Sequence, residues 1–204
     1  MTAVDTNSIC TSKIVTLQQR GVTAVGRYYT TYHPSYQLLR QEAEAITAAG
    51  IKLFVVFENC ANPVLDQTHG TSDAKLALAH AIALGQPEGS AIYFAAEGLP
   101  DGYHQSDVNN AKNYFSAIKQ VLGQRYATGV YSNGLICAAL ANICRYFWLS
   151  ASMAFDGSAD FYAHGAWNVA QKTPVDQDWD GLSIDVNETK ADFGAFAALQ
   201  ATTV

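Results

Sequence analysis

The chain has 204 residues, and 49% of them are hydrophobic. This length and composition suit a single hydrophobic core, so we expect residues 1–204 to form one domain. Twelve Lys and Arg residues against 18 Asp and Glu residues give a net charge of −6. No basic stripe is available to neutralise phosphates, which argues against nucleic acid as a partner.

Short β-rich runs alternate with helical stretches along the chain, which is typical of a parallel sheet with crossover helices. We predict strands at residues 3–7, 24–30, 52–58, 91–97, 128–133, 147–151, 166–171 and 182–186. Helices are predicted at 9–19, 36–49, 72–84, 105–122, 134–142 and 192–199, with a turn or two of helix within 154–164. The predicted fold is a single (β/α)8 TIM-type barrel, shortened or degenerate in its second half; an open doubly wound sheet is the alternative.

The chain begins without the charged and apolar regions of a signal peptide and has no run of eighteen or more apolar residues. We therefore expect no membrane partner, and we expect a monomer. Localisation stays open, because a role at the cell wall would require a signal-independent export route or release by lysis.

Metal and cofactor motifs are missing from the sequence. The five histidines show no HxH or HExxH spacing, and no GxSxG, GxGxxG or GxxxxGK[ST] motif occurs. We expect no metal and no cofactor. The cysteines do not form a CxxC pair, and we favour free, buried thiols over disulfides for Cys10, Cys60, Cys137 and Cys144.

Carboxylates close several of the predicted strands. The carboxyl ends of parallel strands meet at one rim of a barrel, where ligands bind. Crowding and burial drive carboxyl pKa values apart, leaving one group as an acid and another as a base or nucleophile, as glycoside hydrolysis requires. We expect Asp5, Glu58, Glu97 and Asp185 at this rim, with Asn187 and Glu188 on the last strand.

Each carboxylate also has a structural interpretation. Asp5 and Asp185 would be neighbours on barrel closure and could cap backbone N–H groups, and Glu58 could brace the turn that follows it. Glu97 follows an apolar run and has no cation nearby in sequence, which favours a functional role. Aromatic residues on the strands could pack the barrel or present flat faces to sugar rings: Tyr28, Tyr29, Tyr32, Tyr131, Trp148 and Trp167.

Six motifs, in this order, resemble the glycoside-hydrolase-like domains of bacterial cell-envelope and phage-associated proteins, distant relatives of the family 25 lysozymes. They are AVDTN at 3–7, GVTAVGRYY at 21–29, AIYFAAE at 91–97, GVYSN at 129–133, WNVAQ at 167–171 and SIDVN at 183–187. The resemblance implies a shortened (β/α)8 barrel that hydrolyses the glycan strand of peptidoglycan.

By this resemblance Glu97 matches the general acid, and Asp5 and Asp185 match accessory carboxylates. The lysozymes carry Asp-x-Glu where this chain reads Ala95-Ala96-Glu97, so the partner carboxylate must come from Asp5, Asp185 or Glu58. A catalytically silent barrel that binds carbohydrate or peptidoglycan is the alternative, and a different hydrolase on the same barrel is a third. The substrate-binding candidates are Tyr28, Tyr29, Tyr131, Asn133, Trp148, Trp167, Gln171 and Asn187.

Overall fold

Eight strands form a closed barrel in the computed structural model, which describes residues 1–59, 63–97 and 105–201. The strands are β1 (Thr2–Asp5), β2 (Ala24–Tyr29), β3 (Lys52–Phe57), β4 (Ala91–Ala95), β5 (Ala127–Ser132), β6 (Tyr146–Leu149), β7 (Val169–Gln171) and β9 (Ser183–Thr189). Strand β9 pairs with both β7 and β1, which closes the barrel, and the short β8 (Gln177–Asp178) pairs with β9. The predicted TIM-type barrel is thus confirmed.

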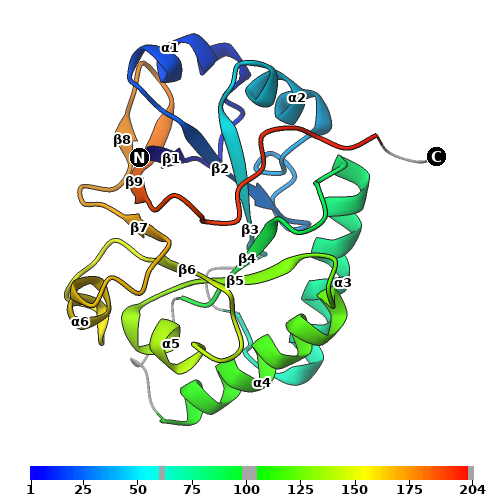
Figure 1. Ribbon diagram of the computed structural model, residues 1–204, viewed down its shortest axis with the longest axis vertical. Helices are drawn as coiled ribbons and strands as arrows, with labels where there is room; N and C mark the ends of the chain where they lie inside the picture. The colour runs from blue at the N-terminus through cyan, green and yellow to red at the C-terminus, as the bar shows by residue number, and fades with distance from the viewer. Residues whose placement is uncertain (60–62, 98–104, 202–204) are drawn as a thin grey trace.

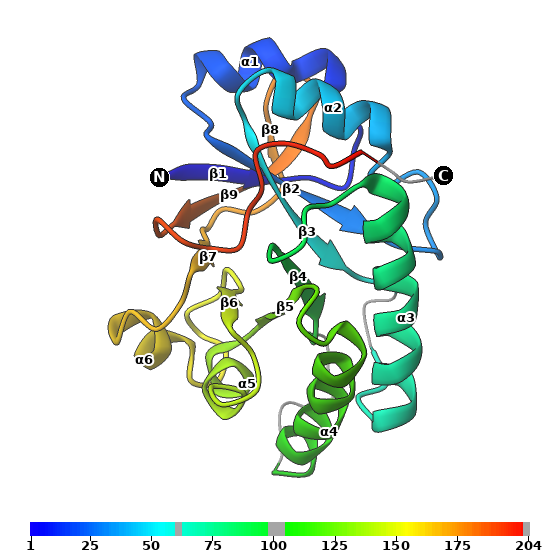
Figure 2. The same cartoon turned by 45° about the vertical axis from the view of Figure 1, so that its right-hand side comes forward.

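Helices cover the outside of the barrel (Figure 1). They are a 3-10 turn at Thr11–Lys13, α1 (Ile14–Gln19), α2 (Arg40–Ala48), α3 (Gln67–Leu84), α4 (Gln105–Leu122), α5 (Gly134–Ala139) and α6 (Ser158–Ala163). Helices α3 and α4 lie side by side on one flank (Figure 2). Between β7 and β9 the chain forms β8 and no helix, so the second half of the barrel is reduced as predicted.

The closing strand runs in the direction opposite to that predicted. Strand β9 is antiparallel to β1 and β7, whereas β1 to β7 are parallel to one another. A parallel strand needs a crossover of a dozen or more residues, whereas an antiparallel strand can follow a short connection. The eleven residues 172–182 between β7 and β9 contain the hairpin strand β8 and no crossover helix, which accounts for the reversal.

Residues 192–199 do not form the predicted closing helix. The segment runs across the amino-terminal end of the barrel, where Gly194 accepts a hydrogen bond from the Ala91 amide at 2.8 Å and Phe196 exchanges backbone hydrogen bonds with Leu53 at 2.8 Å each. The Tyr93 hydroxyl donates to the Phe193 carbonyl at 2.7 Å. These pairings use backbone groups that a helix would have used internally, and Phe193 seals the barrel interior.

Two predicted helix starts also differ from the structure. Helix α3 begins at Gln67 because the Asp66 side chain accepts a hydrogen bond from the His69 amide and caps the helix. Helix α2 begins only at Arg40, since Leu38 donates a backbone hydrogen bond to Tyr28 and the preceding residues extend along β2. Tertiary pairing therefore overrides local helix propensity there.

The barrel interior is filled by large aromatic side chains. Phe54, Tyr93 and Trp148 are fully buried, with ring centroids 5.0 to 6.4 Å apart in edge-on arrangements. Glycines make room for them: a Cβ on Gly26 would lie 2.7 Å from the Phe54 ring and 2.8 Å from Asp5 Cβ. The core is thus a packed interior rather than a channel.

A buried ion pair joins the barrel to its helical layer. Arg27 on β2 is fully buried and makes a bidentate pair with Glu42 on α2, at 3.0 and 3.1 Å. The Arg27 guanidinium also donates to the Thr6 carbonyl at 2.6 Å, and Glu42 accepts from the Cys10 amide at 2.9 Å. This network holds the loop that follows β1.

The described cysteines Cys10, Cys137 and Cys144 are free and buried, as favoured from the sequence, and Cys60 lies outside the described residues. Burial raises the pKa of the Cys10 thiol to about 12. No helix within the described ranges is long and apolar enough to cross a membrane.

We predict that Gly26→Ala lowers the free energy of unfolding by about 1 to 3 kcal/mol, because the added methyl group overlaps Phe54 and Asp5. Denaturant unfolding of Gly26→Ala, Phe54→Leu and the double variant measures this. Phe54→Leu makes room for the methyl group, so the double variant should lose less stability than the sum of the single losses. Additive losses would contradict the steric explanation.

Candidate active site

The structure brings the four predicted carboxyl groups together at one end of the barrel. Asp5 at the end of β1 pairs in register with Asp185 near the start of β9, so the reversed strand still places Asp185 at the rim. Glu58 directly follows β3, and Glu97 lies two residues beyond β4. The charges of Asp185 and Glu58 raise the pKa of Asp5, and the charge of Glu97 raises the pKa of Glu58. Glu188 instead pairs with Thr2 at the opposite end, which corrects its predicted place on the rim.

Two amide side chains hold the Asp5 and Asp185 carboxylates. Asn187 Nδ2 donates to Asp5 Oδ2 at 2.6 Å, and Gln171 Nε2 donates to Asp185 Oδ2 at 2.7 Å and to Asp5 Oδ2 at 3.4 Å. The Asp176 amide donates to Asp185 Oδ1 at 2.6 Å. Gln171 and Asn187 are both buried, so their geometry is fixed by packing.

Aromatic side chains orient these amides in turn. The Tyr131 hydroxyl donates to Gln171 Oε1 at 2.9 Å, and Trp148 Nε1 donates to Asn187 Oδ1 at 2.9 Å. With their oxygens so engaged, the amide nitrogens of Gln171 and Asn187 face the carboxylates. The network therefore presents hydrogen-bond donors, and no cation, to Asp5 and Asp185.

Burial raises the pKa of both carboxyl groups of this pair. The pKa of Asp5 is raised well above its ordinary value, chiefly by burial and then by the charge of Asp185, while the hydrogen bonds from Asn187 and Gln171 oppose the rise. Burial likewise raises the pKa of Asp185, and the amide of Asp176 opposes this. The charge of Asp185 thus adds to the effect of burial at Asp5.

Glu58 and Glu97 form a second pair. Burial, followed by the charge of Glu97, raises the pKa of Glu58 to about 7. Burial also raises the pKa of Glu97, and the nearby hydroxyl groups of Ser150 and Tyr131 oppose this rise. Because burial and the charge of Glu97 disfavour its ionisation, Glu58 keeps its proton up to about pH 7.

Two hollows open beside these pairs. The first, of about 90 Å³, is lined by Asp5 and Asp185 together with Tyr28, Thr6, Asn7, Asp176, Ser183 and Ile184. The second, of about 300 Å³, adjoins Glu58 and is lined largely by apolar atoms of Phe57, Pro63, Val64, Ala95 and Tyr114, with Asn59, His69 and Asp73. The rim is therefore accessible on both sides of the carboxylates.

Of the aromatic candidates, Tyr28 and Tyr131 lie at the rim. Tyr28 lines the first hollow, and the nearby carboxylates contribute to raising the pKa of both phenols, behind burial. Tyr29 points to the other face of β2, where it is fully buried and donates to Gln86 at 2.8 Å. Because successive strand residues face opposite sides, these two tyrosines have different roles.

Two tryptophans predicted to bind substrate do not lie where a ligand at the rim would contact them. Trp148 is 1% exposed, so it acts on the site through Asn187. Trp167 precedes β7 and so lies toward the other end of the strand, stacked on Tyr162 with centroids 5.4 Å apart. Asn133 is buried at the rim end of β5, where its Oδ1 caps α5 and its Nδ2 has no hydrogen-bond partner among the described residues.

Sequence reasoning missed Ser150 and Asp176. Ser150 directly follows β6 near Glu97, so the rule that selected the other strand-end residues would have found it. Asp176 has a positive φ of 53°, which no sequence pattern indicated, and its backbone rather than its side chain contacts Asp185. Across the described ranges, no group of three or more His, Cys, Asp or Glu side chains is placed to hold a metal ion.

Comparisons with known proteins agree with this architecture. A family model described as "Rv2525c-like, glycoside hydrolase-like domain" matches residues 15–196. The uncharacterized protein YbfG of Bacillus subtilis is 30% identical over 185 residues, which cover 81% of this chain and 25% of YbfG. The chain thus spans about a quarter of that relative's length.

Solved structures share the fold at low sequence identity. The Tat-secreted protein Rv2525c of Mycobacterium tuberculosis superimposes with a TM-score of 0.80 at 22% identity, covering 95% of this chain and 98% of that one. The modular autolysin LytC of Streptococcus pneumoniae, solved with a synthetic peptidoglycan ligand, gives a TM-score of 0.58 at 16% identity, covering 91% of this chain and 46% of LytC. By the family match, this chain belongs to the Rv2525c-like, glycoside hydrolase-like domains.

Proposed function

We propose that this domain hydrolyses the glycan strand of peptidoglycan by carboxylate acid/base catalysis. The observation that carries the proposal is the Glu58–Glu97 pair at the barrel rim, in which Glu58 keeps its proton up to about pH 7. A proton available at that pH is what protonation of a glycosidic oxygen requires. The similarity to an autolysin that binds a peptidoglycan ligand supports the choice of substrate.

Within this proposal Glu97 gives the proton to the leaving oxygen, and the neighbouring Glu58, which is protonated up to about pH 7, supplies a proton to Glu97. Strand register supports the pairing: Phe57 on β3 lies opposite Phe94 on β4, so Glu58 and Ala95 occupy the next positions along their strands. A carboxyl group on β3 therefore stands beside the position where the lysozymes carry their first strand-four aspartate.

Asp5 and Asp185 supply the partner carboxylate in this mechanism. When ionised, either group stabilises the positive charge that develops on the sugar ring or activates a water molecule. Gln171 and Asn187 fix the orientation of both groups through the hydrogen bonds described above. Tyr28 and Tyr131 provide the aromatic surface beside them.

A second candidate function is a catalytically silent barrel that binds carbohydrate or peptidoglycan. Ala95 favours it, because an aspartate of the lysozyme pattern is replaced there by a side chain that cannot take part in proton transfer. Such a protein would keep the tyrosines and amides of the rim as binding groups while releasing no product.

We expect Glu97→Gln to lower glycan cleavage by roughly 100-fold or more, which is the usual contribution of a general acid. Mass spectrometry of fragments released from purified peptidoglycan measures reducing-end muropeptides. Glu44→Gln, which alters an exposed carboxylate on α2, is the control and should keep full activity. Undiminished cleavage by Glu97→Gln would refute the assigned role, and wall binding without release by any variant would favour the silent barrel.

The rate of cleavage should fall as the pH rises through about 7, because Glu58 then loses its proton. In Glu58→Gln this titrating group is absent, so the fall near pH 7 should disappear. Cleavage rates from pH 4 to 9 for the wild type and this variant measure the difference. Superimposable pH profiles would show that Glu58 supplies no proton to the reaction.

The raised pKa of Glu58 should also make the fold less stable at high pH. Above 4.5, its ordinary pKa, the unfolded chain gives up the Glu58 proton, whereas the folded chain keeps it until about pH 7. The free energy of unfolding therefore decreases through this window and stays lower above it. Glu58→Gln should be more stable than the wild type at pH 8 by about 1 to 3 kcal/mol, with little difference at pH 4. Equal stabilities at both pH values in denaturant unfolding would contradict this.

A further inference from the structure

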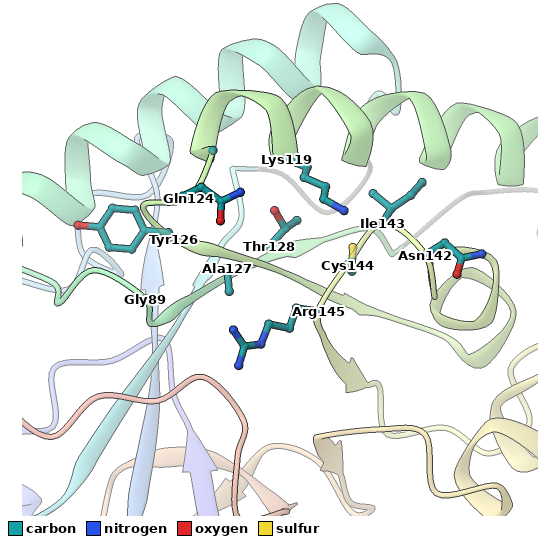
Figure 3. A pocket seen from close by; sticks show the side chains of 11 residues that line it. Gly89, Lys119, Gln124, Tyr126, Ala127, Thr128, Asn142, Ile143, Cys144 and Arg145 are labelled. Carbon is teal, nitrogen blue, oxygen red and sulfur yellow. The ribbon is translucent and has the colours of Figure 1, made fainter.

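A third cavity, of about 300 Å³ and separate from the two hollows at the rim, opens at the amino-terminal end of β5 (Figure 3). Strand β5 runs from this cavity to Asn133 at the rim, so the two ends are separated by the length of a six-residue strand, roughly 20 Å. The cavity is lined by Gly89, Lys119, Gly123, Gln124, Tyr126, Ala127, Thr128, Asn142, Ile143, Cys144 and Arg145.

The charge of this lining is opposite to that of the molecule. Lys119 and Arg145 contribute positive charges, and none of the lining residues is an Asp or Glu, although the chain carries a net charge of −6. Figure 3 shows Lys119 beneath α4 near Thr128 and Cys144, while Arg145 extends away from Lys119 at the edge of the cavity. Lys119 forms no ion pair or hydrogen bond with the residues that the structure describes.

The hydroxyl group of Thr128 is the most informative polar group in the cavity. Thr128 lines the cavity, and its side chain makes no hydrogen bond within residues 1–59, 63–97 and 105–201. Its hydroxyl oxygen is not among the buried atoms that lack a partner, so it is open to the cavity. The cavity therefore offers a hydrogen-bonding group to a molecule that enters it.

Structural roles account for part of this arrangement. Lys119 lies in the last turn of α4, where a cation interacts favourably with the carbonyl end of the helix. Arg145 lies over the Tyr146 ring at 5.1 Å and 3.8 Å from Asp192. Neither role engages the Thr128 hydroxyl or fills the cavity, which is the size of the smallest ligand sites in proteins.

We propose that this cavity binds a phosphate group carried on a sugar-sized molecule, with Lys119 as the charged contact, Thr128 as a hydrogen-bond donor and Arg145 adding positive charge at the edge. An ammonium group and a hydroxyl group both suit the oxygens of a phosphate. Ile143 contributes apolar side-chain surface to the lining beside Lys119. The site is independent of the carboxylate rim and goes beyond the proposed hydrolysis.

Isothermal titration of the full chain with glucose 6-phosphate, inorganic phosphate and glucose, at low ionic strength, tests the proposal. We expect saturable binding of glucose 6-phosphate at one site and no binding of glucose there. Lys119→Met should weaken this binding by roughly tenfold, the value of one charge-assisted hydrogen bond. Lys112→Met, which removes an exposed lysine of the same helix outside the cavity, is the matched control and should bind like the wild type.

Two further variants test whether binding depends on the stability of the fold or on the carboxylate rim. Thr128→Val keeps the shape of the side chain and should weaken binding severalfold without lowering the thermal unfolding midpoint, whereas Glu97→Gln should bind normally. Tighter binding of glucose 6-phosphate than of inorganic phosphate would identify a phosphorylated sugar, and equal binding would identify the phosphate group alone. Absence of saturable binding, or equal weakening by Lys112→Met and Lys119→Met, would overturn the proposal.

Discussion

The register between β1 and the reversed strand β9 is the constraint on which the carboxylate rim depends. Asp5 lies opposite Asp185 and Ala3 lies opposite Asn187, so alternate residues of both strands face the interior together. A slip of one residue would turn the inward side chains of β9 to the other face and remove Asn187 from Asp5. Closure of the barrel and assembly of the Asp5–Asp185 pair are therefore one structural event.

The two faces of the barrel wall treat buried charge differently. Between the wall and α2, Arg27 is neutralised by Glu42 with bidentate hydrogen bonds, as a buried charge requires. On the inner side, Asp5 has only amide donors from Asn187 and Gln171, and it makes no ion pair with a described residue. Burial, followed by the charge of Asp185, raises its pKa, and the amide hydrogen bonds only partly oppose the rise. Holding these carboxyl groups therefore lowers the stability of this end of the barrel.

Strand positions could be predicted from the sequence because apolar β-rich runs are separated by helix signals and glycines. The direction of β9 could not, because periodicity is the same for parallel and antiparallel strands. The segment after β9 reads as a helix, yet it pairs with Leu53 and Ala91, partners that only the closed barrel supplies. Likewise, Tyr28 and Tyr29 look equivalent in sequence, and only the strand's alternation assigns Tyr28 to the rim and Tyr29 to the helical layer.

The replacement of an aspartate by Ala95 need not remove the acid chemistry, since the adjoining strand carries Glu58 at the neighbouring position. A carboxyl group there meets the same two conditions, burial and proximity to Glu97, that would raise the pKa of an aspartate on β4 itself. Ala95 also leaves space beside Glu58, as part of the apolar hollow that adjoins it. Under the proposed mechanism, Glu58 thus stands one strand away from the aspartate of the lysozyme pattern, and Ala95 leaves a volume next to it that changes the shape of the site.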